Sequence, residues 1–447
     1  MALTPEESTL IESLSQDASR YERQDALMSA YYEGEQVLLH MGLAVPPELR
    51  QFTTIVNWCR TMVDTIENRQ DVKAILLPGE ERANDQLRAV WEANNLDSDL
   101  TLLNLDRMIY GRWFLSVGSN EADKNLPLVT VESPRQMTVK INPRKRAIDA
   151  ALRLYGRTED DPNPSLGTLY LPDATVWIAK GDKGWQEVDR DEHNLGRVPV
   201  IAGFNRRRSG DWLGRTQMAD IIPVVDAAAR TLTNLQLAVE THAVPQKWVL
   251  GVSKGDFVGR DGQPLPEWLA YYSAIWANQS KDAKVGQFAA SDLKNFHETV
   301  NLYGQLASTV TGFPARYFGQ FTTNPPAEGA IRADENQMVK SIERQNTQVG
   351  TTLGWAMGLA ERFRTGEWVD GNRIAVEWFD PATPTVSQRE DALSKRRASG
   401  VLSREGYWDE LGWSEARKDR ERSYLRAEAN DMLGIEPPEK PLPLSDG

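Results

Sequence analysis

The sequence predicts an α+β protein built from roughly three structural units. The chain has 447 residues, and a domain takes about 150 residues on average. Apolar side chains recur with the helical period near both ends of the chain and with the strand period in the middle. Runs of strands flanked by runs of helices are typical of the α+β class. With 40% hydrophobic and 26% charged residues, the chain has enough apolar material to form cores.

The first part of the chain is predicted to be helical. Residues 1–50 carry nine acidic side chains against three arginines in a helical composition, and Pro46-Pro47 interrupts them. Residues 56–66 place apolar side chains three and four positions apart, which predicts a helix with Cys59 on its buried face. Two further helices are expected at 85–91 and 99–110.

From Gly111 the period changes from 3.6 to 2, which predicts a mainly antiparallel β region. Short β-rich runs are separated by Gly, Pro, Asn and Asp, as in Asp161-Pro162 and Gly181-Asp182. The runs are WFLSVG, LVTVES, QMTVKI, ALRLYG, GTLYL, TVWIAK and VPVIAGF. Helices and strands together are assigned to residues 1–215.

Two helices follow, at 216–244 and 291–312, with a small mixed segment at 245–290 between them. In the first, apolar side chains alternate four and three residues apart, as in a helix that packs against other helices. They are Ile221, Val225, Ala228, Leu232, Leu235 and Val239. The second places Leu293, Phe296, Val300, Tyr303 and Val310 on one face. The pair and the segment between them predict a stalk that ends in a compact tip.

The remaining chain divides into residues 313–380 and 381–447. A loop-like stretch precedes a long helix expected from Pro326 to Phe363, and a strand is expected at 374–379. Glycines at 350, 354 and 358 each weaken the long helix by about 1 kcal/mol, so they indicate close packing or a bend. Residues after 381 have mixed charge and helical composition, and a Pro-rich tail of disordered composition closes the chain.

No catalytic, cofactor-binding or metal-binding residues are predicted. The sequence has no GxxxxGK[ST], HExxH or CxxC motif, and it has one cysteine and four scattered histidines. Residues 251–255 match G-x-S-x-G, but turn-forming residues follow the serine where an esterase-type site needs a helix. The N-terminus lacks the features of a signal peptide, and the longest charge-free stretch, 299–315, is too short and polar for a membrane span. We therefore expect a soluble, intracellular, non-enzymatic protein.

Two clusters of side chains have a functional and a purely structural interpretation. The basic cluster Arg206, Arg207 and Arg208 fits contact with phosphate or with an acidic neighbouring subunit, and it equally fits a solvated loop. The aromatic run at 268–276 fits either a partner surface or local core filling. The net charge of -13 disfavours tight nucleic-acid binding, because lysine and arginine supply the attraction for phosphates.

The order of these features resembles the portal protein, or head-to-tail connector, of tailed double-stranded-DNA bacteriophages of the long-tailed type. The segments that carry the resemblance succeed one another along nearly the whole chain. They are NWCRTMVDTIENR (57–69), WEANNLD (91–97), YGRWFLSVG (110–118), AALRLYGR (150–157), GRVPVIAGFNR (196–206), the stretch 214–251, TGFPARYFG (311–319), NPPAEGAIRADE (324–335) and the stretch 387–414.

The resemblance implies a portal fold and a ring, usually of twelve identical subunits, at one capsid vertex. In that fold residues 1–215 form a wing, 216–244 and 291–312 the two stem helices, and 245–290 the clip. Residues 313–380 would supply a channel loop, a long bent helix and a strand that completes the wing, and 381–447 a helical crown with its tail.

The resemblance also implies partners and contact residues. The ring would be a channel for DNA packaging and ejection, located in the virion and assembled in the host cytoplasm. Its partners would be terminase, a head-tail adaptor, the major capsid or scaffolding protein and, transiently, double-stranded DNA, with no membrane. The expected DNA-facing channel loop comprises Phe318, Gln320, Phe321, Thr322, Thr323 and Asn324. The expected clip contacts are Lys254, Asp256, Arg260, Asp261, Trp268, Tyr271, Tyr272 and Trp276.

Three alternatives remain open at this point. Another ring-forming head-tail connector or adaptor is disfavoured by length, since adaptors are usually much shorter. A packaging-associated nucleic-acid enzyme would need a phosphate loop or a metal-binding carboxylate cluster. A generic cytoplasmic α+β protein would be a monomer.

Overall fold

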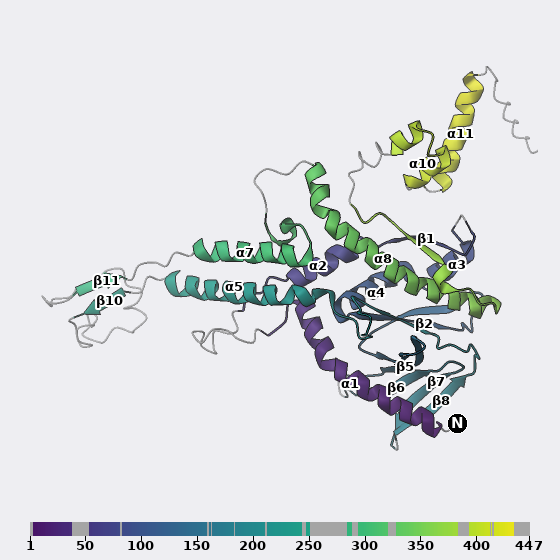
Figure 1. Cartoon of the computed structure of the whole chain (residues 1–447), viewed down its shortest axis with the longest axis horizontal. Coiled ribbons are helices and arrows are strands. Elements are labelled where there is room, and N and C mark those ends of the chain that lie inside the picture. Colours follow the sequence, from purple (N-terminus) through teal and green to yellow (C-terminus); the bar gives the residue numbers. More distant parts are fainter. Residues whose placement is uncertain are drawn as a thin grey trace, which may run out of the picture. The chain divides into compact units, whose positions relative to one another are not determined.

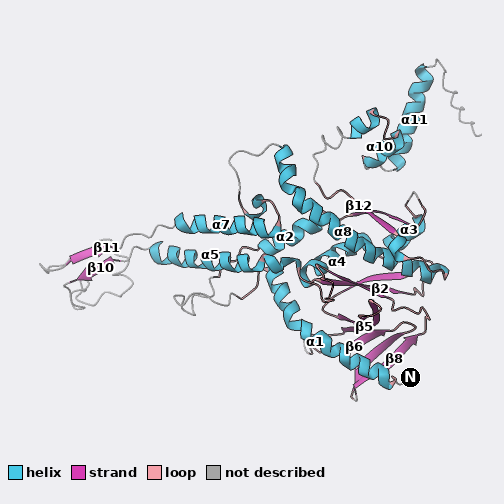
Figure 2. Ribbon diagram, viewed as in Figure 1, coloured by secondary structure: helices cyan, strands magenta, loops and turns pink. Residues whose placement is uncertain are grey.

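The computed structural model describes most of the chain and divides it into two compact units, Met1–Pro381 and Ala382–Gly447. The described residues are 3–37, 53–80, 83–158, 161, 163–182, 184–210, 212–243, 247–250, 284–287, 294–320, 328–382, 393–411, 413 and 415–432. The mixture of helices and antiparallel sheets confirms the α+β class (Figures 1 and 2).

The N-terminal helices form where the sequence places caps and apolar stripes. They are α1 (Pro5–Glu33), α2 (Trp58–Glu67), α3 (Asp85–Ala93) and α4 (Leu96–Tyr110). Thr4 caps α1 in a reciprocal box with Glu7, which satisfies backbone N–H groups that lack a partner inside the helix. Cys59 on α2 is fully buried, as expected, and burial raises the pKa of its thiol to about 12.

The β region forms two antiparallel sheets. Strands β2 (Arg112–Gly118), β3 (Leu128–Glu132) and β9 (Val200–Phe204) make a three-stranded sheet in the order β3-β2-β9. A five-stranded sheet runs in sequence order through β4 (Met137–Asn142), β5 (Ala147–Tyr155), β6 (Leu166–Tyr170), β7 (Thr175–Gly181) and β8 (Gly184–Asp191). α1 covers this second sheet through Ile11 and Leu14.

Strand β8 was not predicted, because its sequence GWQEVDRD is mostly charged and polar. It lies at the edge of the five-stranded sheet, pairs only with β7 and has a largely exposed pattern of side chains. Charged side chains on an edge strand protect its free backbone groups from pairing with other chains. The strand therefore forms through pairing with β7 without contributing a strongly apolar face.

A long helix, α8 (Glu328–Thr365), covers the three-stranded sheet. Apolar side chains of the helix and of the sheet, far apart in sequence, pack together in one core. Strand β1 (Val72–Leu76) pairs antiparallel with β12 (Ala375–Trp378), so the chain returns here to its N-terminal part. The 3-10 turn η5 (Gly371–Arg373) lies against α8.

The glycines of α8 make this close approach possible. A Cβ at Gly354 would lie 2.5 Å from the carbonyl oxygen of Gly371, and one at Gly358 would lie 2.8 Å from that of Val369. The glycine repeat therefore marks close packing, but the chain that approaches it is Val369 and the 3-10 turn η5 and not a second helix.

The stalk helices are α5 (Ile222–Ala243), preceded by the 3-10 turn η2 (Gln217–Asp220), and α7 (Lys294–Thr311). They pack against each other along their length, as Figure 1 shows. Between them in the chain, β10 (Lys247–Leu250) and β11 (Lys284–Gln287) pair as an antiparallel hairpin. After α7 comes the 3-10 turn η4 (Ala315–Phe318).

The second unit is helical in its described part, with α10 (Arg404–Glu410) and α11 (Glu415–Met432). Trp408 is buried and stacks on Trp413, with ring centroids 5.7 Å apart. Lys418 pairs with Asp409 and ties the two helices together.

Candidate functional site

Each stalk helix packs one of its faces against other elements of the same chain. Ile221, Val225 and Ala228 are buried in a core that α2, α4, α7, α8 and η4 share with them. The first half of the apolar face of 216–244 therefore packs against other helices, as its four- and three-residue spacing predicts, but those helices belong to the same chain. These side chains fix the base of the stalk to the rest of the first unit, and only the later part of α5 remains open, with Val239 at 42% exposure.

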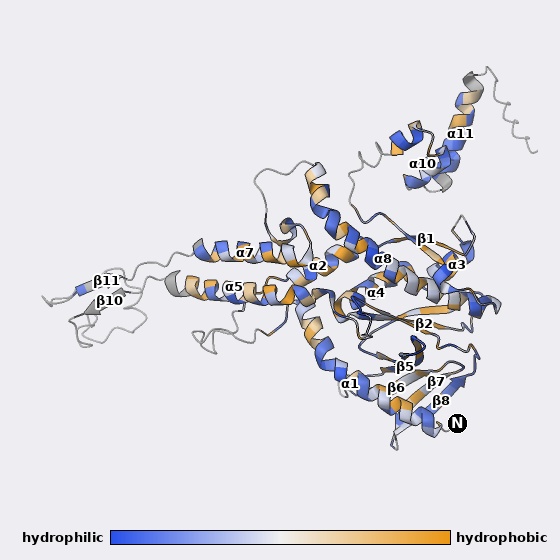
Figure 3. Ribbon diagram, viewed as in Figure 1, coloured by the Kyte–Doolittle hydropathy of each residue, from blue (hydrophilic) through white to orange (hydrophobic). Residues whose placement is uncertain are grey.

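An exposed apolar stripe lies on the outer face of α7. Leu302, Leu306 and Val310, here called the α7 stripe, are 51%, 42% and 44% exposed. Their spacing of four residues places them on one side of the helix, next to the side that carries the buried Ala307. From residue 301 to residue 310 the other exposed side chains, Asn301, Gln305 and Thr309, are uncharged, whereas Glu298, one turn before Leu302, is exposed and acidic. Figure 3 shows apolar residues along both stalk helices.

The part of this face from residue 301 to residue 310 carries no charge and has the composition of a protein interface. Interface cores are depleted in charged residues, and an exposed helix of a monomer normally carries them. The sequence analysis placed Val310 on the packing face of α7, but it missed Leu302 and Leu306. The signal was present as the four-residue spacing of Leu302, Leu306 and Val310.

The segment expected to begin the channel loop starts inside the core. Phe318 is 3% exposed and meets Trp58 edge-to-face, with ring centroids 5.8 Å apart. Its side chain cannot face DNA, so this residue is corrected from a contact residue to an anchor of the loop. The next members differ: Gln320 is partly exposed and donates to the backbone carbonyl of Asn301, while Phe321, Thr322, Thr323 and Asn324 lie outside the described residues.

Polar contacts hold the start of this loop in place. Arg316 pairs with Asp334 at 2.9 Å and also with Glu335, both on α8. The Tyr317 hydroxyl donates to Glu335 at 3.0 Å and accepts from Arg69 at 2.9 Å. The entry to the loop is thereby fixed to α8 and to the end of α2.

The expected clip contacts cannot be located. Lys254, Asp256, Arg260, Asp261, Trp268, Tyr271, Tyr272 and Trp276 lie outside the described residues, as does the G-x-S-x-G match. Only the β10–β11 hairpin represents the 245–290 segment in the described part.

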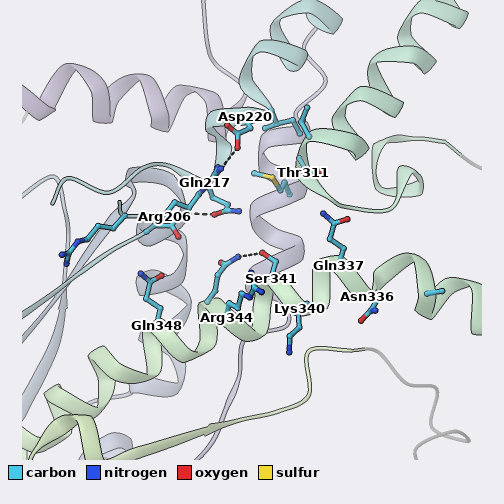
Figure 4. A pocket seen from close by; sticks show the side chains of 17 residues that line it. Arg206, Gln217, Asp220, Thr311, Asn336, Gln337, Lys340, Ser341, Arg344 and Gln348 are labelled. Carbon is cyan, nitrogen blue, oxygen red and sulfur yellow. Dashed lines mark hydrogen bonds and ion pairs between the residues drawn. The ribbon is translucent and has the colours of Figure 1, made fainter. Parts of the chain in front are cut away.

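Two of the three arginines in the basic cluster, residues 206–208, already contact other side chains of the chain. Arg206 pairs with Asp220, and the Arg207 guanidinium lies over the Trp212 ring with its carbon 3.3 Å from the ring centroid. Arg208 is exposed and has no ion pair within the described residues. Arg206 and Arg207 line a cavity of about 880 Å³ between η2, the end of α7 and α8 (Figure 4). Val310 of the α7 stripe lines the same cavity, so the two features adjoin.

A buried polar network, which the sequence did not suggest, connects α8 to the N-terminal helices. Arg107 on α4 is completely buried and donates to Gln345 and Gln70, each at 2.7 Å, and Gln70 donates to Asn346 at 2.6 Å. Burial lowers the pKa of Arg107 to about 9, because no carboxylate offsets the loss of hydration. The network fixes the position of α8 at this point.

The described residues offer no group of three or more His, Cys, Asp or Glu that could hold a metal ion. Among those same residues, no helix combines the length and apolar character that crossing a bilayer requires.

Comparison with known proteins places the chain in a family. The model of the family described as "Phage portal protein, SPP1 Gp6-like" matches residues 10–432. The portal proteins of Mycobacterium phage L5 and Mycobacterium phage D29 are each 32% identical over 421 residues, which cover 91% of this chain and 86% of the relative. A chain from the neck of an empty GTA particle has a similar fold, with a TM-score of 0.50 and 14% identity over 88% of this chain and 94% of that one. This chain therefore belongs to the phage portal protein family, SPP1 Gp6-like.

Proposed function

We propose that this chain is the subunit of a ring at one vertex of a phage capsid, through which DNA enters and leaves. Membership of the portal family supports the role, and the α7 stripe is the observation on this chain that carries it. A closed ring of identical subunits needs one face of each subunit to bind a different face of the next. An uncharged apolar stripe on an exposed helix provides such a face.

In this proposal the parts of the fold take the portal roles. Residues 1–215 are the wing, completed by 313–380, the α5–α7 pair is the stem, 245–290 the clip, and 381–447 the crown. The ring has twelve subunits. The clip binds terminase during packaging and the head-tail adaptor afterwards, and the wing meets the major capsid or scaffolding protein. The ring is assembled in the host cytoplasm and remains in the virion.

The charge of the chain fits a channel that lets DNA pass without holding it. Each subunit adds a net charge of -13, and duplex DNA carries about one phosphate per 1.7 Å of its axis. Repulsion between the two keeps DNA from binding tightly to the ring. The segment from Gln320 to Asn324 is uncharged and follows a firmly anchored turn, so we assign it to the channel wall.

Electron microscopy of the purified full chain in negative stain tests the ring. We expect end-on views with a central hole and side views with a narrow stem. A preparation that remains monomeric at all concentrations would contradict the proposal. We also assign the chain a structural and not an enzymatic role, so ATP hydrolysis or DNA cleavage by the purified protein alone would contradict that assignment.

A further inference from the structure

A groove rich in arginine runs along α8 and meets the α7 stripe at Val310. The cavity of about 880 Å³ shares Arg207 and Gln348 with a second cavity of about 530 Å³, which lies between α8, β9 and the turn that joins β4 to β5. We call the two together the basic groove. Its described lining residues include one carboxylate, Asp220, and six cations. The cations are Arg146, Arg197, Arg206, Arg207, Lys340 and Arg344.

Most of this positive charge is not neutralised within the described chain. Arg206 pairs with Asp220, and Lys340 pairs with Glu343. The other four, Arg146, Arg197, Arg207 and Arg344, have no ion pair among the described residues. Burial lowers the pKa of Arg197, and the charge of Asp370 opposes this effect. In a chain with 64 acidic and 51 basic residues, such a concentration of cations is unexpected.

Two of these four arginines lie over tryptophan rings. The guanidinium carbon of Arg207 lies 3.3 Å from the centroid of Trp212, and that of Arg197 lies 3.8 Å from the centroid of Trp355. A guanidinium is planar, and one that lies over an aromatic ring uses its face for the ring and can use its edge for hydrogen bonds. Arginine binds carboxylates through such an edge, by two parallel hydrogen bonds.

The groove also contains residues with an unusual backbone conformation. Four residues other than glycine have positive φ in the described chain, and two of them, Arg146 at 53° and Arg206 at 49°, line the groove. Left-handed backbone is unusual for a long side chain, and Asn or Gly normally takes such a position. Residues held in unfavourable conformations concentrate at functional sites.

We propose that the basic groove binds carboxylate side chains of the neighbouring copy of this chain. The inference rests on the proposed ring and names the contact made next to the stem. The groove is continuous with the α7 stripe through Val310, so a protein surface that covers the stripe also reaches the groove. A second copy has an excess of acidic residues, which complements the four free arginines.

DNA fits this groove less well than a protein does. Its floor includes the apolar side chains Val200, Phe204 and Trp113, which a peptide can cover and a phosphate backbone cannot. A cavity of about 530 Å³ admits a few side chains, whereas a duplex would contact only its rim.

Zero-length cross-linking of the assembled full chain tests the proposal. Arg146→Lys and Arg344→Lys keep the charge at two exposed positions and add an amine, which a carbodiimide couples only to a carboxylate within ion-pair distance. Mixing nitrogen-15-labelled and unlabelled subunits before assembly identifies coupled peptides that come from two different copies. Lys145 belongs to the same turn as Arg146 and is exposed, but it lines neither cavity, so it is the internal control.

We expect the introduced lysines to give at least several-fold more links between copies than Lys145 gives in the same rings. Rings that form normally but give no more links than the control would overturn the inference and leave the proposed function intact. Links suppressed by a duplex DNA that binds the rings would assign the groove to nucleic acid, which also overturns it. A chain that forms no rings contradicts the proposed function itself, and the inference with it.

Discussion

Replacing two leucines of the α7 stripe by glutamine is expected to weaken ring assembly without unfolding the subunit. Leu302 and Leu306 are 51% and 42% exposed, so about half of each side chain remains to be buried by a neighbour. Complete burial of a leucine contributes about 1.5–3 kcal/mol, which gives about 1 kcal/mol for each half. The double variant Leu302→Gln/Leu306→Gln should therefore lose about 2 kcal/mol per subunit contact, or roughly a 30-fold change in the association constant.

The variant and its control are chosen to separate assembly from folding. Glutamine and leucine have similar helix propensities, so α7 itself is little affected. Leu166→Gln is the matched control, because Leu166 is 41% exposed but lies on strand β6, away from the stripe. Mass photometry over a range of concentrations gives the fraction of rings, and thermal unfolding of the subunit checks the fold. The reasoning is refuted if the double variant assembles at the same concentration as the parent chain.

Three further predictions concern the subunit itself. Phe318→Ala should destabilise the subunit by about 3–5 kcal/mol, because the ring is buried against Trp58. An unchanged melting temperature would contradict this burial and support the original assignment of Phe318 to the channel surface. Gly354→Ala should lower the melting temperature even though alanine favours helices, because its Cβ would lie 2.5 Å from a carbonyl oxygen, whereas Gly329→Ala on the same helix meets nothing within 4 Å and should not lower it. Burial raises the pKa of Asp106 from 3.8 to about 7, with Arg112 opposing and Asp25 adding to the effect, so the folded state holds an extra proton between these values. Stability should therefore fall as pH rises from about 4 to 7, by at most about 4 kcal/mol, and denaturant titrations of Asp106→Asn that show the same slope as the parent would contradict this.

Local patterns in the sequence predicted most elements of the fold. The change of period at Gly111 marks the end of α4, and the alternating runs after it correspond to strands β2 to β7 and β9. The long helix was expected at 326–363 and is Glu328–Thr365. These features depend on neighbours within a few residues, which is why a single sequence reveals them.

Features that depend on distant contacts were missed. β1 is a strand because β12, some 300 residues later, pairs with it, and no local pattern announces that pairing. Phe318 looks like a loop residue next to Gly319, but Trp58 from α2 provides its buried environment. On α7 both sides carry apolar residues, and only the position of α5 decides that Ala307 faces inward and Leu306 outward. The sequence therefore predicted a stalk but not which of its faces is free.

A cryo-electron-microscopy reconstruction of the assembled full chain tests the central claim most directly. We predict a closed ring around an axial channel, with Leu302, Leu306 and Val310 of each subunit covered by the next one. A closed ring in which these three side chains face solvent, or an assembly without an axial channel, would contradict the account.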